Sequence, residues 1–160
     1  MVDMKSALAY SCNCYFAALA DEIGAGKLAK TMRQVGIDAD SRFELETSRN
    51  SIYLAKGATE SELVETAIGQ GRTGVTPLYM AMLASAFAND GMMMKPYIVD
   101  HVVYPDGTET KNTVPEKLTE ICTAEEAAAI RDMMIGVVSG GTGTAAAING
   151  VTVAGKTGTA

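Results

Sequence analysis

Two short motifs near the two ends of the chain carry side chains that could perform acyl transfer. The first places Ser11 and Asn13 on either side of one residue and supplies a hydroxyl and a carboxamide. The second begins at Lys156, reads Lys-Thr-Gly-Thr-Ala, and supplies an ammonium and two hydroxyls. Together they are two of the three motifs of a serine acyl-transfer site that uses lysine as its base. The spacing therefore predicts an enzyme of this chemical class.

The motif that would complete such a site is a serine followed three positions later by lysine. No serine in the chain has lysine at that offset. The serines are Ser6, Ser11, Ser41, Ser48, Ser51, Ser61, Ser85 and Ser139. We therefore expect residues 1–160 to be part of a larger enzyme domain, truncated at both ends. Because the nucleophile is lacking, we expect this segment to be inactive by itself.

Histidine and cysteine chemistry are poorly supported. A Ser-His-Asp triad could use only His101, which lies in an alternating stretch that predicts a strand with this residue on a solvated face. Cys12, Cys14 and Cys122 are an odd set, and one intervening residue gives the first two poor geometry for a disulfide. A Cys-x-Cys pair also falls short of a metal-ligand set. We expect buried free thiols, no metal and no cofactor.

Composition limits the partners and the compartment. The formal charge of −6 argues against nucleic-acid binding, which requires clustered lysine and arginine. No apolar run approaches the ~18 residues that a membrane span needs, and the first residues lack the features of a signal peptide. If the parent is exported, its targeting segment precedes Met1. At 160 residues the chain suits one domain, which would bury about 70% of its unfolded surface.

Apolar periodicity and capping signals predict a mostly helical chain. Thr76-Pro77 is a start signal, and Thr123 with Glu126 forms a capping box. The nearly all-apolar helix after Pro77 is expected to be buried on most sides. Residues 38–57 have no clear period and are expected to form a loop. The expected helices are residues 3–10, 13–23, 27–35, 60–68, 77–88 and 124–138, with a short turn at 145–148.

Strand signals are fewer. Residues 97–104 and 108–113 flank a Pro-Asp-Gly turn and predict a β-hairpin. The β-branched run from Val151 predicts a strand that leads into Lys156. The terminal motif would then lie on a sheet edge, while Ser11 and Asn13 would lie at a junction between two helices. If this terminal strand lacks its neighbours, its unpaired backbone groups favour disorder or self-association of the last residues.

The same C-terminal residues fit a second pattern. Residues 150–157 match the phosphate-loop expression, a glycine and four residues followed by Gly-Lys-Thr. A phosphate loop follows a strand and opens a helix after its Lys-Thr pair. Here the loop positions are β-branched and Gly158 is a poor helix former. A nucleotide-binding protein therefore remains the weaker alternative.

Each site residue also has an ordinary structural explanation. Ser11 and Asn13 are good capping residues at a helix junction. Lys156 could be a solvated strand-end lysine, and Thr157 could be an ordinary strand residue. In that case the chain would be a helical interaction module without enzymatic activity. The joint order of the motifs and their context favours the catalytic interpretation.

Three runs of the sequence resemble the transpeptidase domain of class B penicillin-binding proteins. The resemblance spans the whole chain, from the second motif of that domain to its third. A second Ser-x-Asn occurs at Ser48, in the stretch without clear period. Ser11 is preferred because it lies between two predicted helices and before a Tyr-Phe pair, as in the family. The runs are residues 7–16 (ALAYSCNCYF), residues 67–71 (AIGQG) with Val75-Thr76-Pro77-Leu78 and Ala81, and Gly143-Thr144-Ala145 with residues 153–160 (VAGKTGTA).

The resemblance implies a role for each motif residue. Ser11 would belong to the proton relay to the leaving amine, and Asn13 would hydrogen-bond the missing lysine and a substrate amide. Lys156 would supply positive charge beside Ser11. Thr157 and Thr159 would bind the substrate carboxylate, with the backbone N–H of Thr159 forming half of the oxyanion hole. The glycine between them, Gly158, would let substrate lie against the strand.

The resemblance also implies fold, substrates and location. The fold would be α+β, a mostly helical subdomain with a small β-hairpin and the first part of the Lys-Thr-Gly strand. The parent would cross-link peptidoglycan stem peptides through a serine acyl-enzyme, bind β-lactams, and be anchored to the membrane outside the cytoplasm. The alternatives with the same site are a serine β-lactamase and a penicillin-sensing receptor.

Overall fold

The structure is a computed structural model that describes residues 2–54 and 57–158. It is predominantly helical with two small sheets, so the predicted α+β class is confirmed. The 38–57 segment is irregular where it is described, as expected. The elements, in chain order, are α1 (Met4–Ala9), α2 (Asn13–Ile23), α3 (Ala25–Gln34), α4 (Glu60–Ala67), α5 (Pro77–Ala88), β1 (Met92–Met94), β2 (His101–Val103), β3 (Glu109–Asn112), β4 (Lys117–Glu120), α6 (Ala124–Gly140) and the 3₁₀ turn η1 (Thr144–Ala146).

Local capping signals determine where the longer helices begin. Thr123 and Glu126 form the predicted capping box at the start of α6, and Thr59 forms another at the start of α4. Before α5, the Thr76 hydroxyl accepts a hydrogen bond from the backbone N–H of Tyr79 at 3.1 Å, with proline at the first helical position. The helix α6 extends two residues beyond its predicted end, to Gly140.

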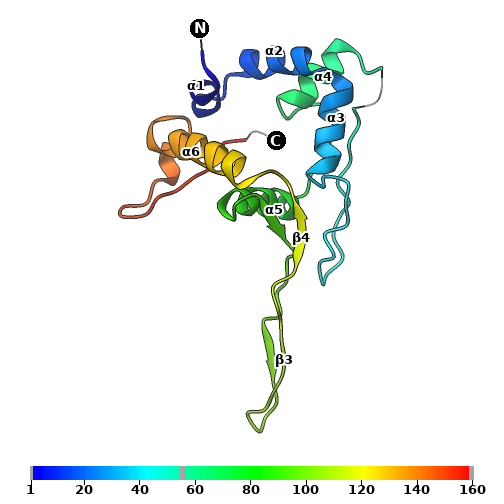
Figure 1. The fold of residues 1–160 in the computed structure, drawn as a ribbon, viewed down its shortest axis with the longest axis vertical. Helices are drawn as coiled ribbons and strands as arrows, with labels where there is room; N and C mark the ends of the chain where they lie inside the picture. Colours follow the sequence, from blue (N-terminus) through cyan, green and yellow to red (C-terminus); the bar gives the residue numbers. More distant parts are fainter. Residues whose placement is uncertain (1, 55–56, 159–160) are drawn as a thin grey trace.

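Each of the two sheets is a single antiparallel pair. The predicted hairpin forms from β2 and β3, and it projects away from the helices (Figure 1). The second pair joins β1 to β4 beside α5, and sequence patterns did not predict it. His101 lies exposed in β2, as predicted. The hairpin also exposes Ile98 and Tyr104, which are 60% and 55% accessible.

Apolar side chains gather in two neighbouring cores, and Met32 and Ile52 pack against both. One core lies between the end of α3, the inner face of α5 and the β1–β4 pair, and includes Tyr79, Met82 and Met93. The other lies between α2, α3 and α4, around Leu54 and Leu63. The short helix α1 packs against α6, apart from both cores (Figure 1).

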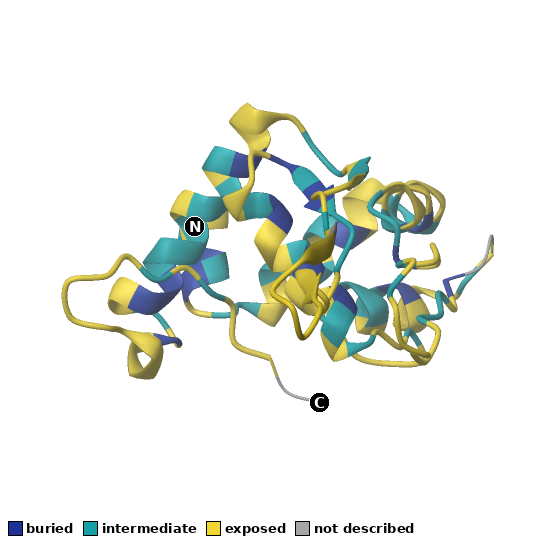
Figure 2. Cartoon of the chain, turned by 90° about the horizontal axis from the view of Figure 1, so that it is seen from below, coloured by how far each residue is buried: buried dark blue, intermediate teal, exposed yellow. Residues whose placement is uncertain are grey.

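The prediction that α5 is buried on most sides is wrong. Met82 and Ala86 are buried, but Met80 is 48% accessible, and Ala81 and Ala84 are also exposed. The helix is apolar except for Ser85 and the Tyr79 hydroxyl, yet only one of its faces has a partner in the described chain. Exposed residues cover much of the other helices too (Figure 2).

The accessible surface of the chain is large for its mass. It measures 10,613 Å², whereas a compact monomer of 16.7 kDa exposes about 7,600 Å². Folding therefore buries roughly 56% of the surface of the unfolded chain, not the predicted fraction of about 70%. Within the described residues, no helix is both long and apolar enough to cross a membrane.

The segment before the terminal motif differs from its prediction. Val151 makes only an isolated bridge to Ile148, and residues 152–158 form no strand. A strand is defined by its ladder, and no described segment lies in register beside this one. The segment instead runs back past α6 toward the α1–α2 junction (Figure 1). The predicted disorder or self-association concerns the last residues, of which Thr159 and Ala160 lie outside the described part of the chain.

Candidate active site

The junction between α1 and α2 presents Ser11 in an unusual backbone conformation. The N–H of Cys12 donates to the Ala7 carbonyl at 2.9 Å, and the N–H of Ser11 donates to the Leu8 carbonyl at 3.3 Å. This pair of bonds is the Schellman arrangement, in which the residue after the C-cap adopts left-handed backbone angles. Ser11 occupies that position with φ of 55°. Glycine is the usual residue there, because a side chain makes the conformation costly.

The structure contradicts the capping explanation for the first motif. The N-cap of α2 is Cys12, whose side chain makes no capping hydrogen bond, and Asn13 is the first helical residue. The Asn13 side chain is exposed and has no hydrogen bond to any residue that the structure describes. The Ser11 hydroxyl instead contacts a residue from the far end of the chain, Lys156.

Lys156 joins the two ends of the sequence. Its ammonium donates to the Ser11 hydroxyl at 3.0 Å across a separation of 145 residues, and to the Thr157 carbonyl at 2.8 Å. Lys156 is therefore not a solvated strand-end lysine without partners, which was the ordinary structural explanation for this residue. Partial burial lowers the pKa of Lys156 below its ordinary value of 10.5, because desolvation disfavours the ammonium.

The backbone around Lys156 is attached to α6. Gly155 donates its N–H to the carbonyl of Met134 at 3.2 Å, which holds the segment against the helix. Thr157 and Gly158, the two described residues that follow Lys156, are not helical.

A third segment connects the two motifs. The N–H of Thr142 donates to the Ala9 carbonyl at 2.9 Å, and the Thr142 hydroxyl lies 2.8 Å from that of Thr157. This segment follows α6 directly and is held there by the N–H of Gly143, which donates to the Val137 carbonyl at 2.9 Å. It thus fixes the end of α1 relative to the terminal motif.

The predicted site residues are brought together to different extents. Ser11, Lys156 and Thr157 form one hydrogen-bonded group. Asn13 lies in the first turn of α2, on the same junction as Ser11. A side chain at Gly158 would meet no described protein atom within 4 Å, so no packing within the chain requires glycine there. Thr159 lies outside the described residues. Sequence patterns did not single out Thr142, which stands in a glycine-rich run after the predicted helix 124–138.

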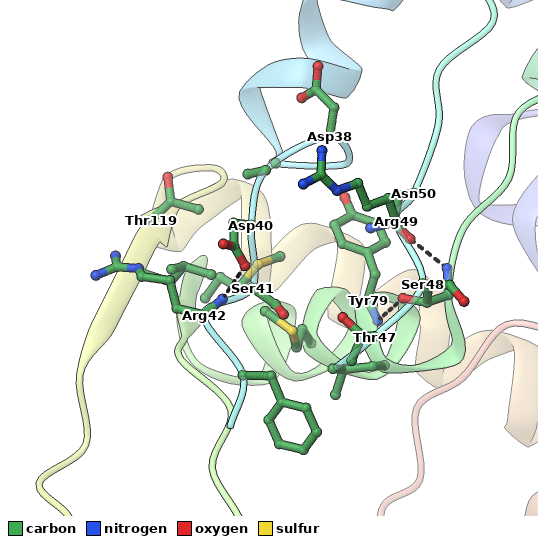
Figure 3. Close-up of a pocket in the computed structure, with 18 of the residues that line it drawn as sticks. Asp38, Asp40, Ser41, Arg42, Thr47, Ser48, Arg49, Asn50, Tyr79 and Thr119 are labelled. Carbon is green, nitrogen blue, oxygen red and sulfur yellow. Dashed lines mark hydrogen bonds between the residues drawn. The ribbon is translucent and has the colours of Figure 1, made fainter. Parts of the chain in front are cut away.

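The second Ser-x-Asn sequence has a structural task. It lines a cavity of about 760 Å³ between the 38–50 loop, α5 and β4 (Figure 3). The Asn50 side-chain oxygen accepts a hydrogen bond of 2.6 Å from the backbone N–H of Thr76, the N-cap of α5. This contact braces the loop against the helix. Ser48 is exposed, and Lys156 does not line the cavity.

The side chains of the cysteines and of the histidine take no part in the hydrogen bonds of the candidate site described above. All three cysteines are free thiols, with Cys14 exposed and the other two half-buried, so the expected burial is only partly met. Burial raises the pKa of the Cys122 thiol, and nearby glutamates add to the effect. The imidazole of His101 lies 3.1 Å from the Asp100 carboxylate, on the exposed hairpin.

Comparison with known proteins gives one consistent result. Residues 1–160 match the family described as the penicillin binding protein transpeptidase domain. The chain is 32% identical over 161 residues to penicillin-binding protein 3 of Bacillus subtilis, covering 99% of this chain and 23% of that protein. It is 35% identical over 166 residues to the peptidoglycan D,D-transpeptidase PbpA of Mycolicibacterium smegmatis, covering 99% of this chain and 32% of that protein. The chain thus spans about a quarter to a third of these relatives.

Solved structures show the same likeness in three dimensions. The D,D-transpeptidase domain of a peptidoglycan glycosyltransferase from Eggerthella lenta superposes with a TM-score of 0.91 at 36% identity, covering 99% of this chain and 42% of that one. PBPA from Mycobacterium tuberculosis gives a TM-score of 0.86 at 30% identity, covering 99% of this chain and 37% of that one. The imipenem acyl-enzyme complex of PBPA superposes with a TM-score of 0.84 at 30% identity, covering 99% of this chain and 36% of that one.

Proposed function

The chain belongs to the penicillin-binding protein transpeptidase domain family, and from this membership we propose that it is part of a peptidoglycan D,D-transpeptidase. The parent enzyme would cross-link stem peptides through a serine acyl-enzyme. The relatives named as peptidoglycan D,D-transpeptidases support this assignment. The observation that carries it is the 3.0 Å contact between the Lys156 ammonium and the Ser11 hydroxyl, which joins the two predicted motifs.

In the proposed mechanism, Ser11 and Lys156 act on protons and charge. The Ser11 hydroxyl would pass a proton toward the leaving amine, and the adjacent ammonium would stabilise negative charge during the transfer. Partial burial lowers the pKa of Lys156, which makes its ammonium a stronger hydrogen-bond donor to the Ser11 hydroxyl. Asn13 has an exposed side chain, which leaves its carboxamide available for a substrate amide and for the lysine of the absent motif.

The end of the terminal motif would bind substrate. Thr157 and Thr159 would donate hydroxyl hydrogen bonds to the terminal carboxylate, and the N–H of Thr159 would complete half of the oxyanion hole. The open space at Gly158 supports this arrangement, because nothing within the described chain accounts for a glycine there. A substrate backbone that lies against the segment would account for it.

The nucleophile would come from another part of the parent protein. We propose that residues 1–160 are an incomplete domain, and that a Ser-x-x-Lys segment packs beside the α1–α2 junction. The surface of the chain supports this view: it exceeds that of a compact monomer by roughly 3,000 Å². The apolar outer face of α5 supports it too, since it has no partner in the described chain.

Labelling with a fluorescent penicillin tests this assignment. The 160-residue chain alone should remain unlabelled, and a domain that joins it to its Ser-x-x-Lys segment should form a stable covalent adduct. Labelling of the isolated chain would refute its inactivity. Failure of the complete domain to label would refute the enzyme assignment. Rapid hydrolysis of the adduct would identify a β-lactamase, and a long-lived adduct without cross-linking of stem peptides would identify a receptor.

The proposed function also implies a location for the parent protein, and the open sheet edges imply self-association of the isolated chain. Because its proposed substrate is peptidoglycan, the parent would work outside the cytoplasm, held by a membrane anchor beyond these residues. The isolated chain would self-associate, because both two-stranded sheets offer unpaired edges. Sedimentation equilibrium of the isolated chain tests the second point: a monomer at all concentrations would contradict it.

A further inference from the structure

Thr142 lies where the two motifs of the site meet. Its backbone N–H donates to the last carbonyl of α1, that of Ala9, at 2.9 Å. Its hydroxyl oxygen lies 2.8 Å from the hydroxyl oxygen of Thr157, 15 residues further along the chain. We propose that Thr142 is a positioning residue, which orients the hydroxyl of Thr157 toward the carboxylate of the substrate. This inference rests on the proposed function, in which Thr157 binds that carboxylate.

Two glycines keep Thr142 in place. A side chain at Gly141 would lie 2.2 Å from the Ala9 carbonyl oxygen, and one at Gly143 would lie 3.1 Å from a methyl group of Val137. The first separation is shorter than atoms allow, so only glycine lets the backbone approach α1 so closely. This close approach brings the Thr142 hydroxyl within hydrogen-bond distance of both the end of α1 and the terminal motif.

Either hydroxyl could donate in the contact between Thr142 and Thr157, and the surrounding acceptors favour donation by Thr142. The Thr142 hydroxyl is 3.4 Å from the Ala9 carbonyl, which already accepts the shorter bond from the backbone N–H of Thr142. Its better acceptor is the oxygen of Thr157, at 2.8 Å. A threonine hydroxyl carries one proton. If Thr157 accepts from Thr142, its own proton is free to point at a carboxylate.

Lys156 acts on the same oxygen from another direction. Its ammonium lies 3.5 Å from the Thr157 hydroxyl oxygen, a long contact that can only donate. Both neighbours of that oxygen therefore favour the state in which Thr157 accepts inside the protein and donates outward. Without the Thr142 hydroxyl, only the long contact to Lys156 would favour this state.

The test uses the complete transpeptidase domain that contains this segment. Thr142→Val removes the hydroxyl and keeps the shape, whereas Thr142→Ser keeps the hydroxyl. Thr152→Val is the matched control, because Thr152 is exposed and its side chain bonds no described residue. A fluorescent penicillin, which carries a carboxylate, is the probe. We expect Thr142→Val to weaken the noncovalent binding step about tenfold, with little change in the acylation rate constant, and Thr142→Ser and Thr152→Val to match the wild type.

A double-mutant cycle adds a readout that a general structural role would not produce. In a Thr157→Val background, Thr142→Val should have no further effect on binding, because the hydroxyl that it orients is gone. Additive losses, equal losses for Thr142→Val and Thr142→Ser, or wild-type binding by Thr142→Val would each overturn the proposal. Thr142→Ala repeats the measurement if the valine variant fails to fold.

The two levels of inference fail in different ways. If the wild-type domain is not labelled, the proposed function is refuted, and the role of Thr142 falls with it. If the wild-type domain is labelled and Thr142→Val binds equally well, only the positioning role is refuted.

Discussion

The junctions at the two ends of α2 solve the same geometrical problem with different residues. Between α2 and α3 the chain turns at Gly24, with φ of 79° and ψ of 151°. Between α1 and α2 it turns at Ser11, with φ of 55°. Both conformations favour glycine, because a side chain is strained at positive φ. The first junction has the residue that the backbone prefers, and the second does not.

The two junctions also differ in the contacts of the residue at positive φ. A side chain at Gly24 would meet no described atom within 4 Å, so that glycine is needed for its backbone angles alone. The Ser11 hydroxyl, in contrast, accepts a hydrogen bond from Lys156. Strained backbone of this kind clusters at functional sites, although Arg42 and Asp90 also have positive φ in this chain. The Ser11 backbone and its contact with Lys156 therefore support the proposed role of the α1–α2 junction without reference to the motif.

The largest effect should follow from removing the hydroxyl at the strained junction. Ser11→Ala in the complete domain should lower the rate constant for acylation by penicillin by about 100-fold or more, since a proton-transfer group is lost. Ser48→Ala is the matched control, because Ser48 starts the second Ser-x-Asn sequence and lies in the 38–50 loop. It should react like the wild type. Stopped-flow acylation kinetics measure both, and a Ser11→Ala domain with unchanged kinetics would remove the reason for the strain.

Transfer of serine to the other junction should reduce stability and leave the chemistry intact. Gly24→Ser places a side chain at backbone angles that are essentially open only to glycine, at a cost of about 2 kcal/mol in the free energy of unfolding. Acylation should be unchanged, because Gly24 contacts no residue of the site. Urea denaturation and penicillin labelling check the two parts separately. An unaltered stability would mean that the two junctions are not equivalent in strain.

A smaller effect should appear when two variants at Ser11 are compared with each other. Ser11→Gly and Ser11→Ala both lack the hydroxyl, so the hydrogen bond to Lys156 is lost in each. They differ in backbone freedom, and the glycine variant should be more stable by about 1 kcal/mol. Both should remain deficient in acylation. Equal unfolding free energies for the two variants would show that the serine is not strained.

Much of the helical framework follows from local signals. The Thr76-Pro77 start of α5 and the capping box at Thr123 were predicted because each involves residues within one helical turn. The β1–β4 pair was not predicted. Met92, Met93 and Met94 have no alternation, and their partners follow only after the whole hairpin. Pairing over such a distance depends on packing beside α5, which leaves no mark in the local pattern.

The candidate site likewise contains residues that local motifs predicted and one residue that they did not. Ser11 and Lys156 were identified from their motifs, and the structure brings them into contact. Thr142 was missed because its contacts depend on the close approach of a glycine-rich turn to the end of α1, which no spacing rule encodes. The terminal strand was predicted from β-branched residues, yet a strand also needs a neighbour. Strand propensity is a property of one segment, whereas the hydrogen bonds of a β-sheet require a second segment beside it.

The smallest effect concerns the pKa of Lys156, whose ammonium contacts Ser11 at the α1–α2 junction. Docking beside Ser11 partly buries Lys156, and this burial lowers its pKa below 10.5 because the charged form loses solvation. Between the folded-state pKa and 10.5 the unfolded chain binds more protons than the folded chain. The contribution of this lysine to stability therefore rises with pH through that window, and it falls away as pH drops through the folded-state pKa. The side chain remains largely exposed, so the change should be small. Titration of the Lys156 side chain by NMR, in the folded chain and in urea, measures it directly. An equal or higher pKa in the folded chain would contradict the burial, and the contrast between the two junctions would then rest on the Ser11 backbone alone.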